Sequence, residues 1–298
     1  MKNELFDAAV WERAWKEDSQ TAVMRMKHAG IDPTRSFDHK AQAFNKEVFS
    51  EGGRRRAKRI IGWLEDQGVT FAGKSVLDIG AASGGFALPF AERGAEVTAL
   101  EPNLPLVELM KDNVAGSATG NIKIVTKPFE DIDVQTNGWE KAFDLVFVSM
   151  CPVWSNWDDV EKVLSCAREF CYLSTMVGSA EHSLLDEVWP LVNGRPRTNE
   201  VMDMAYLSHM LLLKGYAYQS LVTREMQTMV VSHAVALEEV MTMLQTSSRS
   251  ADEQARVRRI ILEHLERNYP SGEVTVRKGG RFGKVLVRLQ NQQMYSRD

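Results

Sequence analysis

The stretch KSVLDIGAASGGF, residues 74–86, marks the point where the pattern of the chain changes from helical to strand-like. SVLDI, residues 75–79, is a short apolar run that leads into a glycine-rich turn. Further strand candidates are AEVTALE (95–101), NIKIVT (121–126), AFDLVFVS (142–149) and FCYLSTMV (170–177), separated by helical stretches. This alternation predicts an α/β fold with parallel strands, right-handed crossovers and helices on both faces of an open sheet. The ligand crevice of such a sheet lies at the carboxyl ends of its strands.

The flanking sequence predicts mostly helices. Helical spacing of apolar residues is found in residues 4–30, 38–67, 181–213, 234–245 and 251–268. A helix break is expected at Gly52-Gly53. Residues 215–232 offer one or two strands, and EVTVRKGGRFGKVLVRLQ (273–290) predicts two antiparallel strands joined by a glycine-containing turn at the end of the sheet.

These elements predict one α/β domain with helical additions. An N-terminal helical extension, or lid, is expected over residues 1–70. The domain itself is expected over residues 71–298, with helical insertions at about 180–215 and 234–268. Extension and insertion are both expected to cover the ligand crevice.

Composition limits the classes of function. The 298 residues include 36 Lys and Arg against 40 Asp and Glu, a net charge of −4, so no global positive field favours nucleic acid or an anionic membrane. The three cysteines have no CxxC spacing and the six histidines have no ligand spacing, which predicts no disulfide framework and no metal site. The chain shows no signal-peptide pattern and no membrane-spanning apolar run, so a cytoplasmic location is expected.

Two acids and a turn of small residues carry the chemistry. Asp78 ends the first strand, and the loop from Gly80 to Gly84 would let backbone N–H groups approach a ligand closely. Glu101 ends the next strand, 21 residues after Gly80, where a carboxylate can accept hydrogen bonds from both ribose hydroxyls. The loop lacks the G-x-G-x-x-G spacing of dinucleotide enzymes, which weakens a nicotinamide interpretation.

The order of these features resembles the class I S-adenosylmethionine-dependent methyltransferases over roughly residues 72–178. Their first motif is an acid followed by three small residues at alternate positions, matched by Asp78, Gly80 and Gly84, with Ala82 where the middle glycine is usual. Glu101-Pro102-Asn103 looks like their ribose-binding acid, Pro128-Phe129-Glu130 follows the third strand where they enclose adenine, and Phe143–Pro152 looks like their fourth strand.

The resemblance implies a Rossmann-like fold, a mostly parallel seven-stranded sheet with an antiparallel end pair, and S-adenosylmethionine as cofactor with S-adenosylhomocysteine as product. The residues expected to contact the cofactor are Asp78, Gly80, Ala81, Ala82, Gly84, Glu101, Pro102, Phe129, Glu130, Ser149 and Met150. A sulfonium methyl group is already electrophilic, so alignment and exclusion of water dominate catalysis. No catalytic base is assigned.

The acceptor is expected to be a small molecule. SFDHKAQAFNKEVF (36–49) looks like the W-D-x-x-A stretch that many small-molecule members place over the cofactor, with Phe37 replacing the tryptophan. Phe37, His39 and Trp154 are the candidate substrate residues.

Two other functions stay open. GAASGGF also resembles the first motif of RNA ribose 2′-O-methyltransferases, but Ser149 stands where that family needs an aspartate. Arg54-Arg55-Arg56-Ala57-Lys58-Arg59 could track phosphates or be a solvated helix face. A non-catalytic cofactor-binding protein is the second alternative. CPVW (151–154) matches the Asp/Asn/Ser-Pro-Pro-aromatic motif of base-modifying enzymes only at Pro152 and Trp154, and Cys151 is expected to be an inert thiol.

Overall fold

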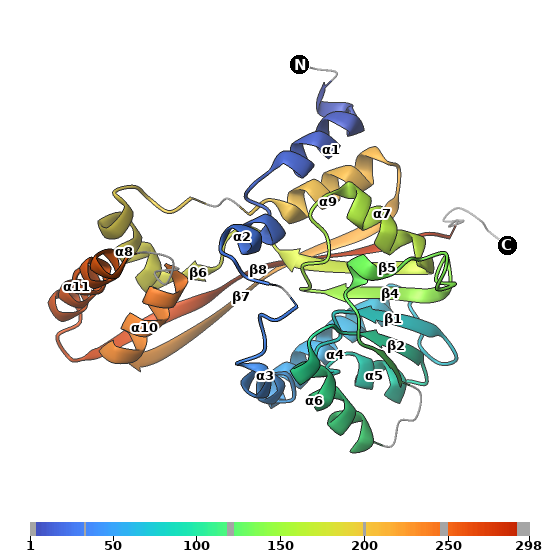
Figure 1. Ribbon diagram of the computed structural model, residues 1–298, viewed down its shortest axis with the longest axis horizontal. Helices are drawn as coiled ribbons and strands as arrows, with labels where there is room; N and C mark the ends of the chain where they lie inside the picture. Colours follow the sequence, from blue (N-terminus) through green and yellow to red (C-terminus); the bar gives the residue numbers. More distant parts are fainter. Residues whose placement is uncertain (1–3, 33, 118–121, 199–200, 245–249, 291–298) are drawn as a thin grey trace. The chain divides into compact units, whose positions relative to one another are not determined.

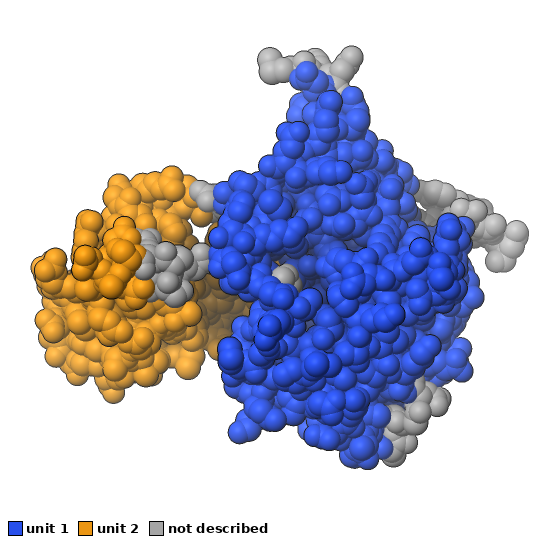
Figure 2. Space-filling model, in the orientation of Figure 1, with its two compact units in different colours: residues 1–175, 203–221, 284–298 blue, residues 176–202, 222–283 orange. Residues whose placement is uncertain are grey.

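A computed structural model describes residues 4–32, 34–117, 122–198, 201–244 and 250–290, and the chain folds into two compact units (Figure 2). Unit 1 comprises residues 1–175, 203–221 and 284–298, and unit 2 comprises residues 176–202 and 222–283. The strand-and-helix alternation lies in unit 1, except for Met176 at the end of its fifth strand.

Five parallel strands form the centre of unit 1 (Figure 1). They are β1 (Ser75–Ile79), β2 (Glu96–Leu100), β3 (Ile122–Val125), β4 (Phe143–Ser149) and β5 (Ala167–Met176), in the spatial order β3-β2-β1-β4-β5. Asp78 pairs with Ala99 of β2 on one side and with Phe147 of β4 on the other. The order reverses between β1 and β4, and ligands of open α/β sheets bind at such a switch point. All five strands were predicted; Asn121, in the prediction for the third, lies outside the described residues.

Helices pack against this sheet because each has one apolar stripe. They are α4 (Glu51–Asp66), α5 (Ala87–Glu92), α6 (Leu104–Ala115), α7 (Trp157–Ser165) and α9 (Asp203–Leu213). Ile61 and Leu64 of α4 are buried in a cluster with Phe90, Phe147 and Tyr172. Full burial of one such aliphatic or aromatic side chain contributes about 1.5–3 kcal/mol, so this cluster is a main source of stability for unit 1.

The N-terminal helices belong to unit 1. They are η1 (Glu4–Phe6), α1 (Ala8–Glu17), α2 (Ala22–His28) and α3 (Ala41–Val48), where η denotes a 3-10 helix. Helix α1 packs on α9 and α7, where the Trp15 ring stacks on Tyr206 at 5.5 Å. Helix α3 packs on α4 and α6. The helices predicted for residues 4–30 and 38–67 are therefore confirmed.

Unit 2 has its own apolar core. It holds β6 (Glu181–His182), α8 (Ser183–Asn193), α10 (His233–Met243), α11 (Ala251–Asn268) and parts of β7 (Ala217–Ser232) and β8 (Glu273–Arg288). Val188, Val240, Ile261 and Val274 are each fully buried in one cluster. Strand β8 pairs with β6 antiparallel and with β7, so the described residues form an eight-stranded sheet, with the two-residue β6 added to the seven expected strands.

Two local predictions were wrong, both at glycine pairs. Residues 273–288 form one continuous strand, with no turn at Gly279-Gly280. A Cβ on Gly279 would collide with the carbonyl oxygen of Glu225, so the glycine permits close approach of β7 rather than a reversal of the chain.

The second correction concerns the start of α4. The helix begins at Glu51 after the N-cap Ser50, whose Oγ accepts a hydrogen bond from the Gly53 N–H at 3.1 Å. Gly52 and Gly53 therefore lie inside the first turn, and the break predicted there falls earlier, at Phe49-Ser50. A Cβ on Gly53 would collide with the carbonyl oxygen of Val48, so this glycine lets α3 and α4 join closely.

Candidate active site

The backbone conformation of the loop after β1 explains why its residues are small. Gly80, Ala82 and Gly84 have φ of +75°, +50° and +92°, so all three alternate positions lie in the left-handed region. The N–H groups of Gly80 and Ala81 both donate to the Leu100 carbonyl oxygen, at 2.8 and 3.0 Å, which fixes the loop to the end of β2. The alternate small residues seen in the sequence are thus required by backbone conformation.

Ala82 is the position where this requirement can be measured. A left-handed conformation costs an alanine about 1–2 kcal/mol, whereas glycine adopts it freely. Ala82→Gly is expected to change the free energy of unfolding by less than about 1 kcal/mol, because relief of strain is offset by the greater entropy of the unfolded chain. Ala82→Val is expected to be clearly destabilising, because a β-branched residue tolerates this conformation poorly. Urea denaturation of both variants tests this; equal stability of the valine and glycine variants would contradict it.

Two buried carboxyl groups stand beside the loop. Asp78 and Glu101 are only 3% and 6% exposed. Burial, with a smaller contribution from the Glu101 charge, raises the pKa of Asp78 to about 8. The Asp78 Oδ2 atom has no hydrogen-bond partner among the described residues. A buried, unsatisfied carboxylate oxygen is costly unless a ligand donates to it, so Asp78 fits a cationic or N–H-bearing ligand.

Glu101 is held by backbone donors. Its Oε2 accepts from the Ala82 N–H at 2.9 Å and its Oε1 from the Asn103 N–H at 2.8 Å. Burial raises its pKa, while these two hydrogen bonds lower it. A carboxylate has about four lone-pair sites, so two further donors can still bind. The geometry fits the predicted contact with a pair of ribose hydroxyls.

The end of β4 reaches the same crevice. A Cβ on Gly80 would lie 2.8 Å from the Cβ of Cys151, so the two segments are in van der Waals contact. Burial, followed by the charges of Glu101, Glu130 and Asp78, raises the pKa of the Cys151 thiol well above its ordinary value. The charges of three acids singled out in the sequence therefore act on Cys151, and the raised pKa of its thiol agrees with the expectation of an unreactive cysteine.

Lys162 of α7 holds the loop that follows β3. The Lys162 ammonium donates to the carbonyl oxygens of Phe129 and Glu130, both at 2.9 Å, and lies 4.9 Å from the Phe129 ring centroid. Phe129 is 3% exposed, whereas Glu130 is exposed. Phe129 thus anchors the loop, and the Glu130 side chain stays exposed.

The remaining predicted positions of the site divide between surface and core. Ser149 and Pro102 are partly exposed, and Met150, with φ of +56°, is 44% exposed. Trp154 is 3% exposed and packs in the core.

Residues 34–48 of unit 1 lie against the loop. The Asn103 Nδ2 donates to Asp38 Oδ1 at 2.7 Å and to the Thr34 carbonyl oxygen at 2.9 Å. The Asn113 Nδ2 donates to Asn45 Oδ1 at 3.0 Å and to the Ser83 carbonyl oxygen at 2.9 Å. The N-terminal segment is therefore hydrogen-bonded to the beginning and to the end of α6, beside the candidate cofactor site.

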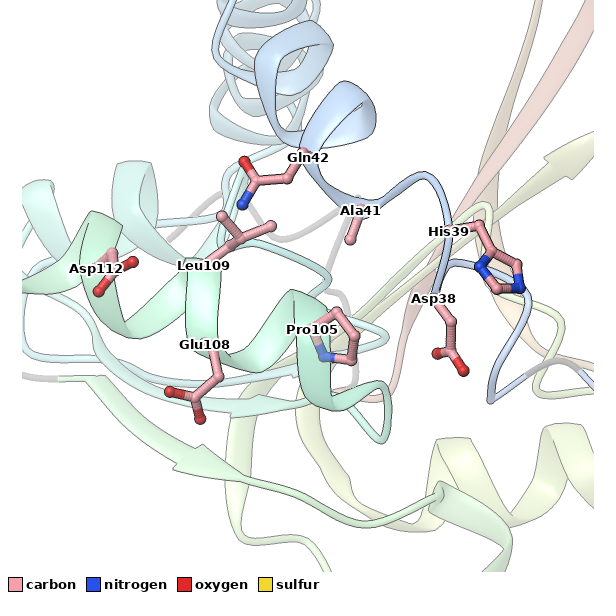
Figure 3. A pocket seen from close by; sticks show the side chains of 8 residues that line it. All are labelled: Asp38, His39, Ala41, Gln42, Pro105, Glu108, Leu109 and Asp112. Carbon is pink, nitrogen blue, oxygen red and sulfur yellow. The ribbon is translucent and has the colours of Figure 1, made fainter.

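A pocket of about 290 Å³ opens beside this contact (Figure 3). It lies between α3 and α6 and is lined by Asp38, His39, Ala41, Gln42, Pro105, Glu108, Leu109 and Asp112. His39 thus lines a pocket, but one formed by the outer face of α6 and not by the Gly80–Gly84 loop. Phe37 packs its edge on Phe44 at a centroid distance of 4.8 Å.

Two residues of the site have roles that were not predicted from the sequence. Asn103 looked like part of a ribose motif, but its side chain caps α6 and binds Asp38. Cys151 was judged inert and was not placed against Gly80. The Asn-Leu-Pro pattern after Glu101 could have identified the N-cap, because asparagine before a proline at the start of a helix is a common capping pattern.

The Arg54–Arg59 run does not form a continuous basic track. Arg54 donates to the Phe49 carbonyl oxygen at 3.0 Å, and Arg55 forms an ion pair with Glu51. In the residues that the structure describes, no group of His, Cys, Asp and Glu side chains is arranged to hold a metal ion. Nor is any of the described helices both long enough and apolar enough to cross a membrane.

Comparison with known proteins agrees with this geometry. Residues 76–171 match the family described as "Methyltransferase domain". A search of curated proteins found no match. Among solved structures, a putative methyltransferase from Bacillus halodurans C-125 is similar with a TM-score of 0.50 and 13% identity, over 77% of this chain and 98% of that one.

Two other solved structures are similar at lower scores. Magnesium protoporphyrin IX methyltransferase from Synechocystis PCC 6803 with bound SAM has a TM-score of 0.46 and 15% identity, over 66% of this chain and 90% of that one. A phosphoethanolamine N-methyltransferase from Haemonchus contortus has a TM-score of 0.49 and 14% identity, over 87% of this chain and 59% of that one.

The matched segment starts in β1 and ends in β5, and so contains the loop, both buried acids and the end of β4. The fold and the order of these features agree with the resemblance read from the sequence. Residues 76–171 therefore form a methyltransferase domain, and the order of its motifs agrees with the class I S-adenosylmethionine-dependent family that the sequence resembles.

Proposed function

We propose that this enzyme transfers the methyl group of S-adenosylmethionine to a small-molecule acceptor in the crevice at the carboxyl ends of β1 and β4. The proposed binding of the cofactor rests on the pair of buried acids, Asp78 and Glu101. One carboxylate oxygen of Asp78 has no hydrogen-bond partner among the described residues. The segment 34–48, hydrogen-bonded to both ends of α6 beside the loop, supports a covered acceptor site that excludes a folded polymer. The net charge of −4 agrees with an acceptor other than nucleic acid.

Different residues would bind different parts of the cofactor. The Glu101 carboxylate would accept the ribose hydroxyls, and Asp78 would face a positively charged part of the cofactor. The left-handed turns at Gly80 and Gly84 let the main chain approach the ligand without a side chain in the way.

Bound cofactor supplies an electrophilic methyl group, so the chain's own contribution is to orient the acceptor and exclude water. The bond between the acceptor atom and the methyl carbon would form as the carbon–sulfur bond breaks, with the thioether of S-adenosylhomocysteine as the leaving group. A neutral acceptor atom takes over the positive charge and then releases its proton to solvent. We assign no general base.

Mass spectrometry tests the proposal. Purified protein is incubated with S-adenosylmethionine and fractionated pools of small metabolites, and S-adenosylhomocysteine and any product heavier by one methylene are quantified. Stoichiometric formation of both supports the proposal. Cofactor binding without product in any pool, or methylation confined to RNA, would contradict it.

Glu101→Ala is expected to weaken binding of S-adenosylhomocysteine by roughly 1–3 kcal/mol, because the ribose hydroxyls lose their acceptor. Glu96→Ala is the matched control, since Glu96 begins the same strand at its exposed end. Isothermal titration calorimetry measures both affinities. Equal affinities for the two variants would remove Glu101 from the site.

A further inference from the structure

Arg56 continues the apolar stripe of α4 toward the carboxyl ends of the strands. The buried residues of this helix are Ala57, Ile60, Ile61 and Leu64. Arg56 precedes Ile60 by four residues and so shares the face that packs on the sheet. Its side chain is exposed. A charged residue on this face, one turn before the buried part of the helix, can stay exposed to solvent and still lie beside the edge of the sheet.

The sheet offers hydroxyl groups at this edge. Phe147 pairs with Tyr172 and Ser149 pairs with Ser174, so these four side chains share one face of β4 and β5. The Phe147 and Tyr172 rings stack at 4.5 Å, and the Ser149 and Ser174 hydroxyl oxygens are 3.4 Å apart. Trp63 of α4 contacts the Tyr172 ring at 6.2 Å, which confirms that α4 covers this face.

Helical periodicity places Arg56 on the same face of α4 as Trp63, about two turns closer to the amino end of the helix, and therefore on the side of the sheet that carries Tyr172. Burial raises the pKa of Tyr172 to about 12, and the positive charge of Arg56 acts in the opposite direction. The Tyr172 phenol group therefore stays protonated and uncharged near pH 7. The Tyr172 hydroxyl forms no well-formed hydrogen bond among the described residues.

Arg56 differs from its neighbours in having no partner. Arg54 binds the Phe49 carbonyl oxygen and Arg55 pairs with Glu51. Arg56 makes no hydrogen bond or ion pair with any residue that the structure describes. An unpaired arginine and neutral hydroxyl groups together fit an anion.

From this arrangement we infer that the methyl acceptor carries a carboxylate or phosphate group, which binds Arg56 and the Ser149 hydroxyl at the ends of β4 and β5. The inference rests on the proposed methyl transfer. A planar guanidinium suits either group, because it can donate two parallel hydrogen bonds.

The position favours the acceptor over the cofactor as the source of this anion. Asp78 and Glu101 end β1 and β2, whereas Tyr172 and Ser174 lie on β5, two strands beyond β1. Neighbouring strands are about 4.8 Å apart, so about 10 Å separates β5 from the acid-lined end of β1. The acidic half of the crevice would hold the cationic cofactor, and the basic half would hold the acceptor's anion.

Anion binding is tested by calorimetry on the full chain saturated with S-adenosylhomocysteine, with inorganic phosphate and acetate as separate probes. Wild-type protein is expected to bind at least one of them, and Arg56→Gln is expected to weaken that binding at least about tenfold, the effect of losing a charged hydrogen bond. Arg55→Gln, one residue away on the same exposed turn, is expected to bind like wild type. No binding to wild type, or equal binding to the two variants, overturns the inference.

A second measurement separates the two sources of a carboxylate. Affinities for S-adenosylhomocysteine and for 5′-methylthioadenosine, which lacks the amino-acid part, are compared between wild type and Arg56→Gln. Unchanged affinities support the acceptor. Loss confined to S-adenosylhomocysteine would assign Arg56 to the cofactor carboxylate and overturn the inference, whereas failure of every variant to bind the cofactor would contradict the proposed function itself.

Discussion

Gly80→Ala is expected to destabilise the protein by about 2–5 kcal/mol and to abolish measurable cofactor binding. Two costs add: a left-handed conformation costs alanine about 1–2 kcal/mol, and overpacking a filled site costs about 1–3 kcal/mol. Gly80 has φ of +75°, and its new Cβ would lie 2.8 Å from the Cβ of Cys151. Relief by movement would displace either the loop or the end of β4, both of which shape the crevice. Urea denaturation and calorimetry with S-adenosylhomocysteine measure the two effects.

Gly68→Ala separates the two costs. Gly68 has φ of +88°, but nothing lies within 4 Å of a Cβ built there. Its substitution is therefore expected to show the conformational cost alone and to leave cofactor affinity unchanged. Cys151→Gly is the second arm, because it removes the colliding side chain and should recover part of the loss in a double-mutant cycle. Equal destabilisation by Gly68→Ala and Gly80→Ala would show that Cys151 does not restrict the loop.

The second large effect is a pH dependence that arises from Asp78. The pKa of Asp78 is about 8 in the folded chain without ligand, against an ordinary value of 3.8. Between these values the folded state binds more protons than the unfolded state, so the free energy of unfolding falls as pH rises, by up to about 1.4 kcal/mol per pH unit. The decrease is expected to begin near pH 4 and to end near pH 8. Asp78→Asn should remove this slope, whereas Asp66→Asn, at an exposed position on α4, should keep it.

Cofactor affinity is expected to change in the opposite direction. A cation beside Asp78 favours the ionised carboxylate, so binding of S-adenosylmethionine requires loss of the proton and strengthens as pH rises toward 8. The gain is at most about tenfold per pH unit. Calorimetry from pH 6 to pH 9 in buffers of different ionisation enthalpy measures both the affinity and the released proton. A flat profile for wild type, or the same profile for Asp78→Asn, would show that Asp78 does not face a cationic ligand.

Local patterns in the sequence were sufficient for most helices and strands and for the expectation that Asp78 and Glu101 lie at one edge of the sheet. The five strands from SVLDI onward were predicted because parallel strands buried on both faces are short apolar runs. Asp78 and Glu101 were predicted because residues that end neighbouring strands of a parallel sheet lie at one edge. These inferences need only hydrophobic periodicity and chain direction.

The glycine pairs show where local patterns were insufficient. Gly52-Gly53 and Gly279-Gly280 looked like chain breaks, yet one pair lies in a helix and the other in a strand. In each pair one glycine is required because a Cβ would collide with a backbone carbonyl oxygen. The oxygen belongs to Val48 in the case of Gly53 and to Glu225 in the case of Gly279. A glycine required by close approach of another segment has the same local sequence as one required by a turn.

The sequence by itself determined the alternation of strands and helices, the small-residue loop and the two acids that end adjacent strands. Only the tertiary structure decided that Cys151 lies against Gly80, that Asp78 loses its solvent and its charge, and that Arg56 is the unpaired arginine of its run. The reason is that periodicity depends on neighbours a few residues apart, whereas burial, pKa and the partners of a charge depend on segments brought together from distant parts of the chain.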